Sequence, residues 1–193
     1  MAKGASISGF PEWLPSERVV EQRVIDTLRK VYELNGFIGI ETRAVETGAS
    51  LLKKGKTSKE IYLLSRLQEV GHDSDTPIEE RLGLHFDLTV PLSRYVVEHS
   101  GALAFPFKRW QIQKVWRGER PQEGRFREFV QADIDVIGAG DLPDHYEVEL
   151  PLVMVSALEE LRAYGLPKAT VHANNRHSST GIFPHLRNLF LCR

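Results

Sequence analysis

The chain has 193 residues, with 25 lysines and arginines against 26 aspartates and glutamates, and a single cysteine, Cys192. Its hydrophobic content of 41% excludes collagen-like, low-complexity and disulfide-rich proteins. It also predicts one substantial core, because a chain of this length buries roughly 70% of its unfolded surface. The net charge of −1 argues against a protein whose main work is to bind a phosphate backbone without sequence preference.

The opening residues and the apolar stretches bear on the compartment. Residues 1–9 contain one lysine and no apolar run, which differs from the pattern of a secretory signal peptide. The longest apolar stretch, residues 150–158, is far too short to cross a bilayer. We therefore expect a cytoplasmic protein with no membrane partner.

The first half of the chain predicts one long helix and several short segments. Residues 16–35 are assigned to a helix because apolar side chains recur every three or four positions, at Val20, Val24, Leu28, Val31 and Leu34. Ser16 is the expected N-cap of this helix. The segments that follow are a strand at residues 37–45, a polar loop at 53–59, a short strand at 61–64 and a second polar loop at 72–80.

The second half is more regular. Residues 82–89 alternate strictly, which predicts a strand with Leu82, Leu84, Phe86 and Leu88 on one face and His85, Asp87 and Thr89 on the other. The segments that follow are a helix at residues 91–99, strands at 109–119 and 125–137 joined by a five-residue loop, and a helix at 144–164. Pro151 predicts either a kink in the last helix or a later start.

The order of these elements predicts an α+β fold, an antiparallel β-sheet flanked by helices. Strands follow strands, and the longest two are neighbours in a hairpin. A doubly wound parallel sheet fits this order poorly, because parallel neighbours need a long crossover connection.

The predicted hairpin has one apolar face and one unusual polar face. In the second strand the polar face carries Arg127, Phe129, Gln131, Asp133 and Asp135. In the first strand the matching positions are Arg109, Gln111, Gln113, Arg117 and Glu119. The ordinary explanation is that one face of an antiparallel sheet is exposed to solvent. Amides, carboxylates, arginines and an aromatic ring gathered along one sheet instead favour a ligand platform.

The residue types on this platform predict a ligand that has both phosphates and a polar organic part. Arg117 and Arg125 flank the loop and can offer planar forks to phosphate oxygens. Phe129 can stack on a base. Asp87, Gln131 and Asp135 can bind a cation such as a protonated amine or imidazole.

The hairpin also resembles a known family. From Arg117 to Phe129 the chain reads Arg-x-Glu-Arg-Pro-Gln-x-Gly-Arg-x-Arg-x-Phe, which resembles motif 2 of class II aminoacyl-tRNA synthetases in the form typical of the histidyl-tRNA synthetase family. Three other segments resemble the same family: residues 85–94 its Asp-Leu-Thr substrate segment, residues 131–135 its histidine-contacting strand, and residues 9–46 its motif 1 region.

The resemblance implies a partial class II catalytic domain over residues 1–176, containing motifs 1 and 2. It implies that histidine is activated with ATP to histidyl-adenylate and then transferred to tRNA(His). The implied ATP contacts are Arg117, which would hold the α-phosphate as the catalytic residue, together with Glu119, Arg125 and Phe129. The implied histidine contacts are Asp87, Thr89, Gln131 and Asp135. Magnesium would bridge phosphate oxygens, no metal site built by the chain itself is expected, and motif 1 implies a homodimer.

The chain also departs from the family pattern. Arg43 stands where motif 1 usually has proline, and residues 177–193 match no part of the family. We find neither motif 3 nor an anticodon-binding domain among the 193 residues, so we expect a truncated or frame-shifted catalytic core with impaired activity. Two alternatives stay open. One is a histidine-sensing regulatory subunit of ATP phosphoribosyltransferase, which resembles the same core, and the other is a non-catalytic dimerising fragment.

Overall fold

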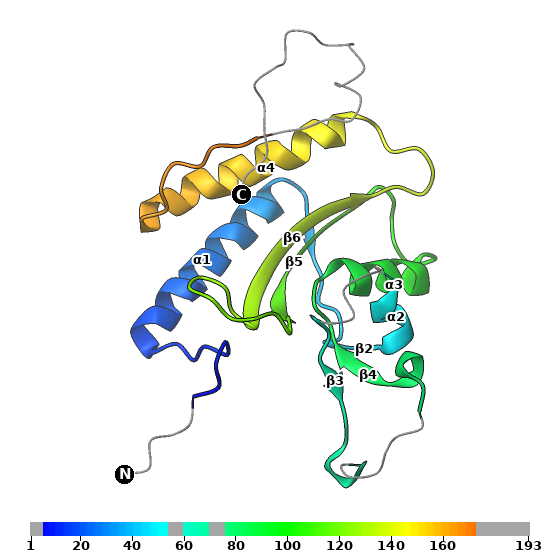
Figure 1. The fold of residues 1–193 in the computed structure, drawn as a ribbon. Helices are drawn as coiled ribbons and strands as arrows, with labels where there is room; N and C mark the ends of the chain where they lie inside the picture. Colours follow the sequence, from blue (N-terminus) through cyan, green and yellow to red (C-terminus); the bar gives the residue numbers. More distant parts are fainter. Residues whose placement is uncertain (1–5, 54–59, 70–75, 173–193) are drawn as a thin grey trace.

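A computed structural model describes residues 6–53, 60–69 and 76–172 of the chain (Figure 1). Most of the polar loop predicted at residues 53–59 and the first part of the loop predicted at 72–80 lie outside these ranges. The atypical tail at residues 177–193 lies outside them as well.

The largest sheet is built on a long antiparallel hairpin. Strands β5 (Phe107–Trp116) and β6 (Glu128–Ile137) pair over ten consecutive residues, from Phe107 opposite Ile137 to Trp116 opposite Glu128. The short strand β1 (Ile38–Gly39) adds to the other edge of β5 in parallel, so the strand order is β1-β5-β6. The sheet is therefore largely antiparallel, as the sequence predicted.

Two helices cover one face of this sheet. Helices α1 (Pro15–Leu34) and α4 (His145–Leu161) run across the hairpin, and Figure 1 shows them as one layer on that side. The buried core between helices and sheet contains Val31, Tyr32, Phe37, Val153 and Ala157, against which the strands pack Trp110, Ile112, Ile134 and Val136. Burial, reinforced by the negative charge of Asp133, raises the pKa of Tyr32 to about 12. This phenol therefore stays neutral in the core.

A second, smaller unit lies on the other side of the hairpin (Figure 1). Its three strands are β2 (Val45–Thr47), β3 (Leu63–Leu64) and β4 (Leu82–Leu84), with antiparallel pairing in the order β2-β4-β3. Two helices belong to it, α2 (Gly48–Leu52) and α3 (Thr89–His99). Short 3₁₀ turns are η2 (Leu67–Glu69) and η3 (Ile78–Glu80) in this unit, and η4 (Arg162–Tyr164) after α4.

The fold class and both long helices are confirmed, but several boundaries are corrected. Helix α1 begins one residue earlier than expected, with Leu14 at the N-cap and Pro15 at the first helical position. The carboxylate of Glu17 accepts a hydrogen bond from the Leu14 N–H at 2.8 Å, so Ser16 is not the cap. Helix α4 starts at His145, so Pro151 lies inside it and does not mark a later start.

Four predicted strands were wrong in extent. Residues 37–45 do not form one strand, because β1 joins the large sheet whereas β2 joins the small one. Strand β4 ends at Leu84, and the next four residues, His85 to Leu88, are all buried, so the predicted alternation fails there. The hairpin strands also end farther from the connecting loop than predicted, because residues 117–119 and 125–127 lie outside β5 and β6, and β5 begins two residues earlier, at Phe107.

The residues before α1 dock on the start of β6. The carbonyl of Gly9 accepts hydrogen bonds from the backbone N–H groups of Arg127, at 2.7 Å, and Glu128, at 3.1 Å. Gly9 has a φ of +86°, and a Cβ built on it would lie 2.9 Å from Cγ of Arg127. Only glycine adopts this backbone conformation easily, so Gly9 allows the close approach that ties the two segments together.

We expect Gly9→Ala to lower the free energy of unfolding by about 1–3 kcal/mol, because the positive φ becomes strained and Arg127 must move. Urea unfolding followed by circular dichroism measures this loss. The matched control is Gly101→Ala: the φ of Gly101 is not positive, and a Cβ added there would have no other atom within 4 Å. That variant is expected to keep its stability or gain up to about 1 kcal/mol. Equal losses in the two variants would contradict the explanation.

Candidate functional site

The polar face predicted for the hairpin exists, and the strand register arranges it in pairs. Opposite residues of an antiparallel ladder have side chains on the same face. Arg109 lies opposite Asp135, Gln111 opposite Asp133, and Gln113 opposite Gln131. We call these six residues the polar row. It lies on the face of the sheet turned away from α1 and α4, because the residues between them pack on the helices.

One end of the polar row is continued by Arg117, just beyond the end of β5. Its Nε donates a hydrogen bond to the carbonyl of Phe86 at 3.1 Å, and its Nη2 donates to Oε1 of Gln131 at 3.2 Å. The guanidinium carbon lies 5.0 Å from the centre of the Phe129 ring. The structure therefore brings together three predicted site residues, a charged fork, an aromatic ring and an amide. The Arg117 side chain is thus partly buried and held by two hydrogen bonds.

The contacts continue along β6 to the carboxylates. Nε2 of Gln131 donates to both carboxylate oxygens of Asp133, at 3.1 and 3.0 Å. Nη2 of Arg109 forms an ion pair with Asp135 and lies 3.9 Å from Oδ2 of Asp133. Burial raises the pKa of the Asp135 carboxyl and the nearby Asp133 adds to this, while the positive charge of Arg109 acts in the opposite direction. Charged and amide groups thus form one chain of contacts from Arg117 to Asp135.

Asp87 and Thr89 lie beside this face, at the start of α3. The Asp87 side chain is almost fully enclosed, with the residue 4% exposed, and its Oδ1 accepts a hydrogen bond from the backbone N–H of Val90 at 3.2 Å. Thr89 is the first residue of α3 and is exposed. The hydrogen bond from Arg117 to the Phe86 carbonyl connects this segment to the polar row.

Glu119 and Arg125 lie on the tip of the hairpin, away from the strands proper. Nη1 of Arg125 is 3.2 Å from Oε2 of Glu119, and the Arg125 side chain is 63% exposed. Arg127 connects this tip to the body of the protein, because its Nε donates to the Glu119 carbonyl at 3.0 Å. The two predicted nucleotide contacts therefore pair with each other rather than with the polar row.

A buried ion pair sets the position of α3, and the sequence did not reveal it. Glu46 on β2 is 1% exposed, and its two carboxylate oxygens accept hydrogen bonds from Nε of Arg94 at 2.8 and 3.0 Å. Arg43, which replaces the usual proline of motif 1, adds a further contact to Glu46 at 3.2 Å. Residues 46 and 94 share no spacing pattern, so only the fold brings them together.

Arg109 was placed on the polar face by the sequence but not selected as a site residue. It is fully buried, and so is its neighbour Gln111, whose Nε2 donates to the hydroxyl of Thr42 at 2.9 Å. The sequence feature that could have identified Arg109 is the alternation that puts it on the same face as Asp133 and Asp135. Its burial and its exact partners depend on strand register, which the sequence did not specify.

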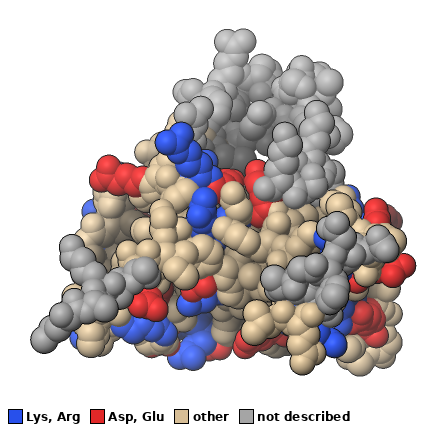
Figure 2. Space-filling view, turned by 60° about the horizontal axis from the view of Figure 1, so that its bottom comes forward, with Lys and Arg blue, Asp and Glu red and all other residues tan. Residues whose placement is uncertain are grey.

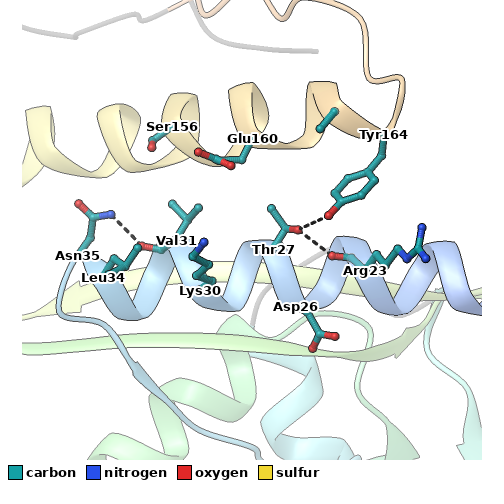
Figure 3. A pocket seen from close by; sticks show the side chains of 11 residues that line it. Arg23, Asp26, Thr27, Lys30, Val31, Leu34, Asn35, Ser156, Glu160 and Tyr164 are labelled. Carbon is teal, nitrogen blue, oxygen red and sulfur yellow. Dashed lines mark hydrogen bonds between the residues drawn. The ribbon is translucent and has the colours of Figure 1, made fainter.

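Other features of the described surface do not belong to this site. A hollow of about 400 Å³ lies between α1 and α4, where the Thr27 hydroxyl donates to the Arg23 carbonyl at 2.8 Å and lies 3.4 Å from the Tyr164 hydroxyl (Figure 3). It is in the helix layer, and no predicted site residue lines it. On the face shown in Figure 2, basic and acidic side chains are interspersed and do not form one basic stripe.

Two other kinds of feature are absent from the described residues. Residues 6–53, 60–69 and 76–172 contain no group of three His, Cys, Asp or Glu side chains placed to hold a metal ion. Within the same ranges, no helix combines the length and the apolar character that crossing a bilayer requires.

Comparison with known proteins identifies relatives over nearly the whole chain. The sequence matches the family described as Histidyl-tRNA synthetase over residues 9–177. It is 96% identical over 183 residues to the histidine–tRNA ligase of Bifidobacterium longum subsp. infantis, covering 95% of this chain and 39% of the relative. It is 55% identical over 184 residues to the histidine–tRNA ligase of Cutibacterium acnes, covering 40% of that protein. The chain thus spans about two fifths of the length of these relatives.

Solved structures agree with this fold. The crystal structure of histidyl-tRNA synthetase from Nostoc sp. PCC 7120 superposes with a TM-score of 0.75 at 40% identity, over 96% of this chain and 40% of that one. A protein from Bacillus halodurans C described as an ATP phosphoribosyltransferase regulatory subunit/histidyl-tRNA synthetase gives 0.65 at 22% identity, over 80% of this chain and 37% of its own. At that identity the likeness shows the fold alone.

We expect Arg94→Met to lower the free energy of unfolding by about 3–5 kcal/mol, because it leaves the buried Glu46 carboxylate without its main partner. Urea unfolding measures the loss. Arg18→Met is the matched control, since Arg18 pairs with Glu21 at 2.8 Å on the exposed side of α1 and exposed pairs contribute about 0–1 kcal/mol. A loss in Arg94→Met no larger than in the control would show that the Glu46 pair does not hold α3 in place.

Proposed function

Because the chain belongs to the histidyl-tRNA synthetase family, we propose that it carries the ATP- and histidine-binding face of a histidine–tRNA ligase. The reaction joins histidine to the α-phosphate of ATP, giving histidyl-adenylate, and then passes the histidyl group to the 3′ end of tRNA(His). The observation that carries this proposal is the single sheet face on which Arg117, Phe129, Gln131 and Asp135 lie together. Because the chain spans about two fifths of its relatives, we expect it alone to be weaker than a full-length ligase.

The phosphate end of the proposed site is the Arg117 side. Its guanidinium is already oriented by the Phe86 carbonyl and by Gln131, so it can meet the α-phosphate without losing much side-chain freedom. The adjoining Phe129 ring offers a stacking surface for adenine. The Glu119 carboxylate would accept a hydrogen bond from the adenine amino group. Arg125, which is mostly exposed, would reach the outer phosphates.

The histidine end of the proposed site is the carboxylate side. Asp135 and Gln131 present an anionic and an amide group to a protonated amine or an imidazole. Asp87 and Thr89, on the segment leading into α3, would complete the contacts to the substrate. Attack by the histidine carboxylate on phosphorus then needs positioning and charge stabilisation, and no covalent enzyme intermediate is required.

Magnesium would enter this site with the nucleotide. The ion keeps several waters and binds phosphate oxygens, with only one or two carboxylates from the protein. The proposal also includes a homodimer, through the segments that resemble motif 1, and a cytoplasmic location.

The decisive experiment is histidine-dependent exchange between ATP and pyrophosphate, run on this chain beside a full-length relative as the positive control. Exchange supports the ligase. Histidine binding by calorimetry without exchange supports the histidine-sensing alternative. If neither is found, and light scattering shows a dimer, the chain is a dimerising fragment.

We expect Arg117→Ala to abolish the exchange, because the α-phosphate loses its charged fork. The free energy of unfolding should fall by only about 1 kcal/mol, since two hydrogen bonds on a partly exposed side chain are lost. Arg29→Ala, on the outer side of α1, is the control and should keep both properties. Retained exchange in Arg117→Ala would contradict the assignment, and a collapse of its melting temperature would indicate a structural arginine instead.

A further inference from the structure

Arg109 is a fully buried arginine on β5, inside the polar row but outside the contacts assigned to substrate. Within the described residues its Nε, Nη1 and Nη2 are enclosed without a hydrogen bond of regular geometry. What compensates its charge is the ion pair with Asp135 and the more distant carboxylate of Asp133. Since an arginine cannot shed its proton in a protein, its fixed positive charge favours the ionised form of the Asp135 carboxyl.

The two carboxylates are not equivalent. Asp133 has both oxygens engaged by the amide of Gln131. Asp135 has its ion pair with Arg109, yet its side chain remains 40% exposed. Arg109 therefore holds the Asp135 carboxylate on its buried side, while the other side of the carboxylate is accessible to solvent.

The charges of the two aspartates explain what a buried arginine beside them does. Two neighbouring carboxylates disfavour the ionisation of each other, and burial acts in the same direction on Asp135. With Arg109 the trio carries a net charge of −1, which matches a ligand group with a single positive charge. Without Arg109 the Asp135 carboxyl would take up a proton at a higher pH, and its attraction for a cation would fall there.

We propose that Arg109 is a positioning residue, which holds the Asp135 carboxylate ionised and in one orientation toward the cationic group of the substrate. This rests on the proposed function, in which Asp135 contacts histidine. Arg109 itself touches no substrate and acts only through Asp135.

The test is the titration of the Asp135 side-chain carboxyl, followed by carbon-detected NMR in the wild-type chain, Arg109→Met and Arg109→Lys. Among the described residues, the charged groups that act on this carboxyl are Arg109 from β5 and Asp133 from β6. Removing the cation should raise the Asp135 midpoint by about one pH unit or more, because an opposite charge in direct contact favours the ionised carboxyl. Arg109→Lys keeps the charge and should recover most of the wild-type midpoint.

The internal control is Glu128, whose partners are Lys114 and Trp116 and whose midpoint should not move in any variant. An unchanged Asp135 midpoint in folded Arg109→Met overturns the proposal. If Arg109→Met does not fold, the reverse measurement decides: Asp135→Asn should speed the exchange of the Arg109 guanidinium protons with water. Guanidinium exchange that is the same in the wild type and Asp135→Asn also overturns it.

Calorimetric titration with L-histidine and, separately, with ATP distinguishes this inference from the proposed function. At the pH of the wild-type Asp135 midpoint, Arg109→Met should weaken histidine binding about fivefold, because a rise of one pH unit lowers the ionised fraction of Asp135 there from one half to about one tenth. ATP binding should be unchanged, which general structural damage would not produce. Histidine binding that is equal in both proteins overturns the role of Arg109 but leaves the proposed function in place. If the wild type binds no histidine while the Asp135 midpoint shifts as expected, the proposed function fails and the control of Asp135 by Arg109 stands.

Discussion

The register of the β5–β6 ladder is the constraint on which the rest of the structure depends. Side chains alternate with a period of two, so a slip of one residue would turn the polar row toward the helices and the apolar row toward the site. The apolar row prevents such a slip, because Trp110, Ile112, Ile134 and Val136 must meet the core side chains of α1 and α4. The helices thus fix the site from the opposite side of the sheet without contributing a residue to it.

The smaller unit, built on strands β2, β4 and β3, lies beside the site. Helix α3 is tied to β2 by the buried Glu46–Arg94 pair, and the segment before α3 offers the Phe86 carbonyl to Arg117. Buried ion pairs add little net stability compared with apolar packing, but removing one partner is strongly unfavourable. Their effect here is to specify one arrangement, in which the start of α3 faces the end of β5.

Local sequence pattern predicted the parts of this fold that depend on a single element. The period of two in residues 128–137 gave the two faces of β6, and the period of three to four gave α1. It failed where the answer depends on a partner. Residues 37–45 divide between two sheets, and residues 85–88 are enclosed on all sides, because the elements around them decide their burial. The same limit applies to the site: the alternation placed Arg109 on the polar face, but its burial follows from the register.

The order of charges along the site gives it a direction. From Arg117 the contacts run through the neutral amide of Gln131 to Asp133, then to Arg109 and finally to Asp135. The accessible ends of this chain are a cation at Arg117 and an anion at Asp135, while the compensating cation, Arg109, is buried between them. A ligand that joins a phosphate to a positively charged group can satisfy both ends in one orientation only, since the reversed orientation places like charges together. An amino acid activated on phosphorus is such a ligand, so the alternation of charge on one sheet face can orient the substrate before any other part of the protein touches it.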